Sequence, residues 1–162
     1  MVMIFVNLPV ADLERSKAFY SALGADVVPE FTDENASCLK WDENVFFMLL
    51  KTDYFASFTD RSVIMPNMGA QSITALSRDS RAAVETAREL VLSSGGGENK
   101  PPVDHGFMYV VSMTDPDGHI IEFTWMAEEA PQPAAPEGLS HQHPDANDAF
   151  SDAEEEGWPV RD

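Results

Sequence analysis

One carboxylate in the last patterned segment of the chain is the residue best placed to do chemistry. Glu122 lies in Asp115-Pro-Asp-Gly-His-Ile-Ile-Glu122-Phe-Thr-Trp-Met, whose first four residues predict a tight turn because Pro fixes φ and Gly supplies a positive φ. The alternation that follows predicts a strand with Ile120, Glu122 and Thr124 on one face. An unpaired charge on so apolar a face is costly. We therefore expect Glu122 to bind a metal or a cationic or hydroxyl-bearing ligand, to act as a general base, or to pair with water, Tyr109 or a backbone amide.

Four further residues are candidates for contacts to a small molecule. Asn7 either hydrogen-bonds a ligand or satisfies backbone near Pro9, and Met48 is an adaptable apolar wall. His105 either acts as an acid or base near neutral pH or lies exposed beside a bend at Gly106. Tyr109 offers a flat apolar face with one polar tip. The candidate ligand-binding set is thus Asn7, Met48, His105, Tyr109 and Glu122, with Glu122 also the candidate catalytic residue.

The overall charge excludes several classes of partner. The chain has 162 residues and a formal net charge of −18, which opposes binding to nucleic acid or to an anionic membrane surface. No apolar run approaches the roughly 20 residues of a membrane span, and the first residues lack the pattern of a signal peptide. The single cysteine, Cys38, cannot form an internal disulfide, and no basic neighbour activates its thiol. We expect a soluble, cytoplasmic protein.

Two similar modules must position these side chains. The first, residues 1–52, predicts strands at 3–9, 25–30, 36–41 and 45–51, with a helix over 13–23 that Gly24 caps. The second, residues 70–127, predicts a strand at 72–77, a helix from 81 to about 92 capped by Ser80, and strands near 98–101, 106–113 and 119–125. Each module therefore reads βαβββ, and the repeat suggests two units that complete each other's core.

Two segments lie outside the modules. Residues 53–69 are rich in aromatics and form either a lid over a ligand cavity or a linker whose aromatics pack on a sheet or at a dimer interface. Residues 128–162 carry ten acidic residues and one basic residue among prolines and alanines. A segment of this composition buries too little apolar surface to offset its ordering entropy, so we expect an acidic, disordered tail.

The chain resembles the vicinal oxygen chelate superfamily, which includes glyoxalase I, bleomycin and fosfomycin resistance proteins and extradiol dioxygenases. The motifs that carry the resemblance are Leu8-Pro-Val-Ala-Asp12-Leu-Glu-Arg-Ser-Lys-Ala-Phe-Tyr20 early and Asp-Pro-Asp-Gly-His-Ile-Ile-Glu122 late. Phe5-Val-Asn-Leu-Pro, Phe47-Met-Leu-Leu and Asp104-His-Gly-Phe-Met-Tyr109 are similar to the bacterial branch of predicted lactoylglutathione lyases. The resemblance covers residues 3–126 and implies an α+β fold of two βαβββ modules forming a cupped mixed sheet.

The resemblance also implies a position for a divalent metal, with two ligands from each module. In this sequence those positions fall at Phe5 (or Asn7), Met48, Ile73 and Glu122, so three of the four lack the usual donor. We therefore expect no metal and no other cofactor, and a small molecule bound in an apolar cavity by a homodimer. The alternatives are a lyase or isomerase that acts on a 2-oxo substrate with Glu122 as base, and a non-catalytic interaction module.

Overall fold

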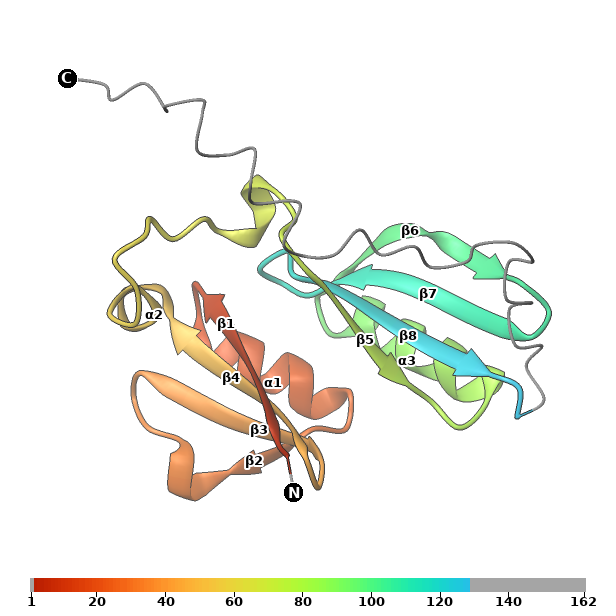
Figure 1. Ribbon diagram of the computed structural model, residues 1–162, viewed down its shortest axis with the longest axis horizontal. Coiled ribbons are helices and arrows are strands. Elements are labelled where there is room, and N and C mark those ends of the chain that lie inside the picture. Colours follow the sequence, from red (N-terminus) through yellow and green to blue (C-terminus); the bar gives the residue numbers. More distant parts are fainter. Residues whose placement is uncertain (1, 129–162) are drawn as a thin grey trace, which may run out of the picture. The chain divides into compact units, whose positions relative to one another are not determined.

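The computed structural model describes residues 2–128, all of which belong to the unit Met1–Ala130. The predicted βαβββ pattern occurs twice, and the α+β fold class is confirmed (Figure 1). The first module contains β1 (Ile4–Val10), α1 (Leu13–Ala22), β2 (Asp26–Val28), β3 (Ala36–Asp42) and β4 (Val45–Lys51). The second contains β5 (Ile73–Ser77), α3 (Arg81–Ser93), β6 (Gly97–Asp104), β7 (Met108–Thr114) and β8 (Ile120–Met126).

The strands form two mixed sheets with the same topology. The strand orders are β1-β4-β3-β2 and β5-β8-β7-β6. The pairs β1–β4 and β5–β8 are parallel, and the remaining pairs are antiparallel. Each module therefore closes its own four-stranded hydrogen-bond ladder instead of contributing to one continuous sheet, and the first strand of each module lies at a sheet edge.

Capping residues explain where the two long helices begin and end. The carboxylate of Asp12 accepts a hydrogen bond from the amide of Arg15 (2.9 Å), and the hydroxyl of Ser80 accepts one from the amide of Ala83 (3.1 Å). Gly24 follows α1 with φ = 103°, a conformation that side chains disfavour. The caps predicted at Ser80 and Gly24 are confirmed.

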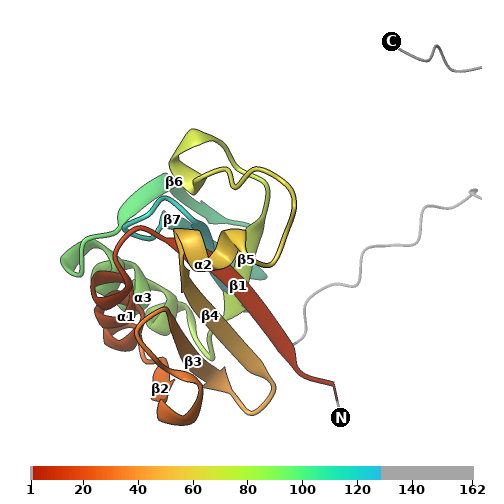
Figure 2. The same ribbon diagram turned by 90° about the vertical axis from the view of Figure 1, so that its left-hand side faces the viewer.

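One hydrophobic core is shared by both modules. Helices α1 and α3 each cover one face of their own sheet, and both views place them on the same side of the strands (Figures 1 and 2). The core cluster includes Phe19 and Tyr20 of α1, Val84 and Val91 of α3, and the inward side chains of both sheets. Burial of these large apolar groups is the main favourable term for folding.

The opposite face of each sheet, which we call its outer face, follows from strand alternation. Leu8, Phe47, Leu49, Ile121 and Phe123 belong to the core, so their neighbours along each strand point the other way. The outer face of the first sheet carries Phe5, Asn7 and Pro9 of β1 and Phe46, Met48 and Leu50 of β4. The outer face of the second sheet carries Ile73 and Ala75 of β5 and Ile120, Glu122, Thr124 and Met126 of β8.

The structure differs from the predicted elements at a few points. Strand β2 ends at Val28 because Pro29 begins a 3-10 helix, Pro29–Phe31, and β6 extends to Asp104. The segment between the modules holds a short helix, α2 (Thr52–Ala56), directly after β4. Apart from Glu128, the predicted acidic tail lies outside the described residues. No helix in the described part is long and apolar enough to cross a membrane.

Candidate functional site

Two adjoining cavities, here called the first and second lobes, lie over the outer face of the first sheet. The first lobe has a volume of about 530 Å³ and the second about 570 Å³. Asn7, Leu50 and Phe58 line both lobes, so the two share a wall. Cavities of this size and of mixed apolar and polar lining suit small organic molecules.

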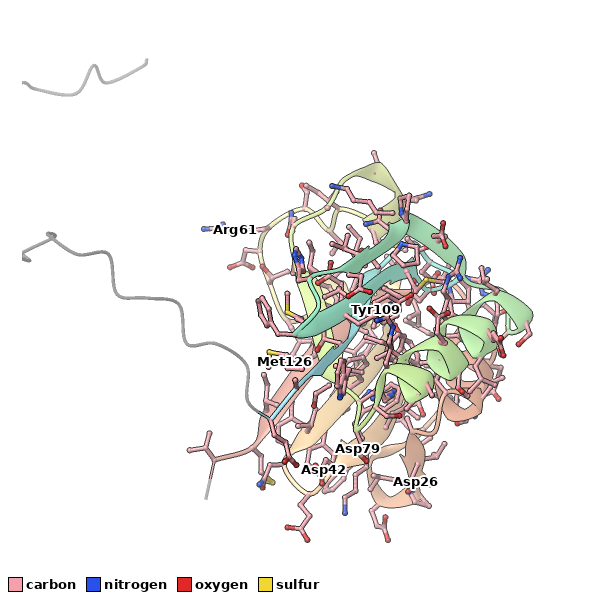
Figure 3. All side chains as sticks on the ribbon, turned by 90° about the vertical axis from the view of Figure 1, so that its right-hand side faces the viewer. Asp26, Asp42, Arg61, Asp79, Tyr109 and Met126 are labelled. Atoms are coloured by element: carbon pink, nitrogen blue, oxygen red, sulfur yellow. The ribbon has the colours of Figure 1, made fainter. Side chains whose placement is uncertain are left out.

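The first lobe is closed by the segment between the modules. Its walls are the end of β1, residues 58–72 and the start of β8, where Gly118, His119 and Ile120 contribute. Its lining contains no Asp or Glu. Arg61 is its charged residue, and Figure 3 shows that side chain reaching outward from the segment, away from the body of the module.

The second lobe is more aromatic and is bordered by acids. Phe5, Phe31, Tyr54 and Phe58 line it, and Tyr54 packs edge-to-face against Phe58 with ring centroids 5.2 Å apart. Glu30 and Asp33 are also in its lining, and Asp33 accepts hydrogen bonds from the amides of Asn35 and Ala36. Met48, predicted as a cavity wall, lines this lobe directly opposite Asn7 on the neighbouring strand.

Glu122 shares a strand face with Ile120 and Thr124, as predicted, but this is the outer face of the second sheet and Glu122 lines neither lobe. It is half-buried between Ala75 of β5 and Ser112 of β7. Its carboxylate forms no hydrogen bond or ion pair with any other residue between positions 2 and 128. Ile120, two residues earlier on the same face, does line the first lobe. The catalytic role of Glu122 therefore stays a prediction.

Tyr109 and His105 are not brought together with Glu122. Tyr109 faces α3, where its hydroxyl donates to Glu85 and the guanidinium carbon of Arg81 lies 4.3 Å from the ring centroid. The hydrogen bond to Glu85 raises the pKa of Tyr109. Figure 3 shows Tyr109 beside α3 and Met126, which shares the face of Glu122, on the other side of the strands. His105 is exposed in the β6–β7 turn and lines neither lobe.

The expectation that Tyr109 and Glu122 share a cavity is therefore wrong. Ser112 of β7 is paired with Glu122, and Tyr109 is three residues before Ser112. An odd separation along a strand puts two side chains on opposite faces. The sequence predicted the alternation of β7 but not its register against β8.

The residues at the family's metal positions do not fit a divalent ion. Phe5, Met48 and Ile73 offer no oxygen or nitrogen donor, and Phe5 stacks on Phe46 with ring centroids 4.9 Å apart. No group of three or more His, Cys, Asp or Glu side chains within residues 2–128 could hold a metal. A thioether favours soft ions, so Met48 does not replace a carboxylate or imidazole.

The Asp-Pro-Asp-Gly turn links the two modules beside the first lobe. Both oxygens of Asp117 are engaged. Oδ1 accepts from the amide of Ala11 (3.0 Å) and from Arg15 (2.7 Å), and Oδ2 accepts from the hydroxyl of Ser16 (2.8 Å). His119 Nε2 lies 2.9 Å from the carbonyl oxygen of Pro9. These bonds position the start of β8 against the end of β1, where the first lobe is formed.

Sequence reasoning missed His119 and residues 70–72 as site residues, whereas a lid over a ligand cavity was one of the two roles predicted for residues 53–69. His119 is part of the motif that marked the turn, and its position directly before the last strand was the available signal. The aromatic richness of residues 53–69 was the signal for a cavity wall, which is one of the two roles predicted for that segment.

Comparison with known proteins identifies the fold. Residues 3–40 match the family model described as bleomycin resistance protein-like N-terminal. The chain is similar to a hypothetical protein from S. aureus (22% identity, 77% of this chain and 94% of that chain, TM-score 0.66). It is also similar to a glyoxalase/bleomycin resistance protein/dioxygenase family enzyme from Burkholderia phytofirmans PsJN (16% identity, 78% and 100%, TM-score 0.66). A lactoylglutathione lyase from Agrobacterium tumefaciens shares 18% identity over 77% and 92%, with a TM-score of 0.58.

The sequence matches none of the curated proteins. The two βαβββ modules and these structural neighbours define the fold: the chain has the fold of glyoxalase and bleomycin resistance proteins. Within that fold class, its first module is similar to the N-terminal part of bleomycin resistance-like proteins. The resemblance drawn from the sequence is confirmed at this level.

Proposed function

We propose that this protein binds a small molecule in the first and second lobes, without the divalent metal of metal-dependent relatives. The observation that carries the proposal is the convergence of both lobes on Asn7, a polar residue on the outer face of β1. Neighbours of the same fold include a lactoylglutathione lyase and the fosfomycin resistance protein from Mesorhizobium loti, so this fold serves small-molecule chemistry elsewhere. Binding without a metal is supported by the side chains at the four implied metal positions, because Phe5, Met48 and Ile73 offer no oxygen or nitrogen donor and only Glu122 does.

A thermal-shift screen of a broad compound library tests the proposal. Each compound that raises the melting temperature of the wild type is repeated on Ala70→Trp, which fills the first lobe from an exposed position. Ala56→Trp is the matched control, because Ala56 is exposed and lines neither lobe. We expect the shifts to shrink in Ala70→Trp and to persist in Ala56→Trp. Binding in this lobe would be contradicted if no compound raised the melting temperature, or if the shifts were the same in Ala70→Trp as in the wild type.

A second candidate function is a lyase or isomerase that acts on a 2-oxo substrate with Glu122 as general base. The observation in its favour is the half-buried carboxylate of Glu122 on the outer face of the second sheet, which has no hydrogen-bond or ion-pair partner among residues 2–128. A carboxylate without partners can take a proton from a bound substrate if the substrate reaches it. This candidate requires a ligand that extends from the first lobe, past Ile120, to Glu122.

We also propose that the working unit is a homodimer. Phe5, Ile73 and Met126 lie on the outer faces and are 45%, 56% and 59% exposed. Large apolar side chains left this open favour association with a second copy. Sedimentation velocity at micromolar concentration is expected to give a dimer, and a monomer throughout the range would contradict this.

A further inference from the structure

His119 gives the first lobe a hydrogen-bond acceptor whose protonation pattern is determined by the fold. Nε2 of His119 lies 2.9 Å from the carbonyl oxygen of Pro9. A carbonyl oxygen can only accept, so Nε2 must carry the proton. In the neutral ring Nδ1 is then unprotonated and can only accept.

Nδ1 of His119 remains open to a ligand. It forms no hydrogen bond with the residues between positions 2 and 128. Within residues 2–128, the side-chain polar atoms that are both buried and without a partner are Trp41 Nε1 and Asn44 Oδ1. Nδ1 of His119 is not one of them, so this unpaired atom is accessible from outside the protein. Because His119 lines the first lobe, Nδ1 is the ring nitrogen that a molecule in the lobe can use.

The rest of the lining restricts what that molecule can be. Apolar surface comes from Leu50, Phe55, Phe58 and Ile120, amides come from Asn7 and Gln71, and hydroxyls come from Thr59, Ser62 and Ser72. Among residues 2–128 no Asp or Glu lines the lobe, so none of these residues offers an ion pair to an ammonium group there. Arg61 also belongs to the lining, but its exposed side chain reaches outward (Figure 3), so it offers an ion pair to a carboxylate only at the open side of the lobe.

We propose that the first lobe binds a neutral molecule with an apolar part, whose hydroxyl or N–H group donates a hydrogen bond to Nδ1 of His119. This inference rests on the proposed function and names the chemical class of its ligand. Pro9 acts as the positioning residue, because its carbonyl holds the ring and its tautomer. The lobe should discriminate against ligands that lack a hydrogen-bond donor, because such a ligand displaces water from Nδ1 and leaves it unpaired.

A matched pair of probes tests the donor requirement. 2-Naphthol carries one hydroxyl donor, and 2-methoxynaphthalene replaces that hydrogen with a methyl group. We expect 2-naphthol to bind the wild type roughly two- to tenfold more tightly in a fluorescence titration, the range that one net neutral hydrogen bond gives. The preference should vanish in His119→Leu and partly survive in His119→Gln, whose amide offers both a donor and an acceptor. The control His105→Leu changes an exposed histidine that lines neither lobe, so this variant should keep the preference for 2-naphthol.

Nitrogen-15 NMR of the imidazole separates ligand contact from a structural effect of the substitution. In the neutral imidazole of the free protein we expect Nε2 protonated and Nδ1 unprotonated. Addition of 2-naphthol should shift the Nδ1 resonance, whereas 2-methoxynaphthalene should not. A neutral imidazole that carries its proton on Nδ1 in the free protein would overturn the proposal. A Nδ1 resonance that does not shift when 2-naphthol is added would also overturn it.

The binding outcomes distinguish this inference from the proposed function. Equal affinity for the two probes, or a preference that persists in His119→Leu, would overturn the role of His119 while leaving small-molecule binding intact. Binding of neither probe would overturn the ligand class, and the library screen would still decide the proposed function. Melting curves of the His119 variants show whether the link to Pro9 is needed for folding, and His119→Gln provides the reading if His119→Leu does not fold.

Discussion

The hydroxyl of Tyr20 donates a 2.7 Å hydrogen bond to Oδ2 of Asp115, joining α1 to the turn before β8. Both side chains are buried. Oδ1 of the same carboxylate accepts from the amides of Asp117 (2.9 Å) and His119 (2.8 Å). Burial raises the pKa of Asp115, so its carboxylate depends on these three donors. The bond is thus a polar link inside the core that the two modules share.

Removal of the Tyr20 hydroxyl should destabilise the protein without creating a cavity. In Tyr20→Phe the buried carboxylate of Asp115 loses a donor, and we expect the free energy of unfolding to fall by about 1–3 kcal/mol. Urea denaturation followed by circular dichroism measures this. Tyr54→Phe is the control, because the Tyr54 hydroxyl contacts none of the described residues through a hydrogen bond, and it should change little. Equal stability of both variants would contradict the link.

The same phenol should make the fold sensitive to alkali. Burial first, and then the Asp115 carboxylate, raise the pKa of Tyr20 well above its usual value of about 10. Above that pH the unfolded chain releases the proton and the folded chain retains it. The stability from this group is therefore fully present below pH 10 and is lost as the pH rises through the raised folded pKa. Between about pH 9 and 11 the melting temperature should fall more steeply for the wild type than for Tyr20→Phe.

Asp117 should be a strong contributor to the contact between the modules. In Asp117→Ala the buried hydroxyl of Ser16 and the amide of Ala11 lose their acceptor. The ion pair with Arg15 adds less, because the Arg15 side chain is 47% exposed and water screens it. We expect a loss of about 2–3 kcal/mol in the free energy of unfolding. Asp60→Ala, which removes an exposed carboxylate, should cost under about 0.5 kcal/mol.

Gly96 should not tolerate a side chain. A Cβ there would lie 2.4 Å from the carbonyl oxygen of Thr114, 2.6 Å from Cγ1 of Val91 and 2.9 Å from Cε2 of Phe19. Backbone and two core side chains would have to move, so Gly96→Ala should lower the free energy of unfolding by about 1–3 kcal/mol. Gly69→Ala is the matched control, because a Cβ at Gly69 meets nothing within 4 Å. Similar melting temperatures for the two variants would show that the packing at Gly96 is looser than described.

Metal content should separate the two candidate functions. For protein purified without a histidine tag, we expect far less than one equivalent of nickel or zinc by mass spectrometry, and the same content in Glu122→Gln. The reason is the apolar side chains at Phe5 and Ile73 and the thioether at Met48. Stoichiometric metal that disappears in Glu122→Gln would overturn the metal-independent proposal and favour the lyase.

Local patterns determined much of the fold. Strand alternation, the cap at Ser80, the left-handed Gly24 and the Asp-Pro-Asp-Gly turn act over a few residues, so they are readable one segment at a time. They predicted both modules, the strand face that Glu122 shares with Ile120 and Thr124, and the poor fit of Phe5, Met48 and Ile73 to a metal. These conclusions need only the identity of each residue and its place in a strand.

Tertiary structure decided which of the candidate residues meet. Alternation puts Tyr109 on one of two faces, but the choice depends on the register of β7 against β8, and a shift of one residue reverses it. The first lobe exists because residues 58–72 fold back over the end of β1 and the start of β8. This is a contact between segments that are far apart in sequence. His119 became a site residue only when the turn that it follows packed against Pro9. The sequence by itself determined the modules and their chemistry, whereas long-range packing decided the faces and the cavity, because register and loop closure depend on partners that no local pattern encodes.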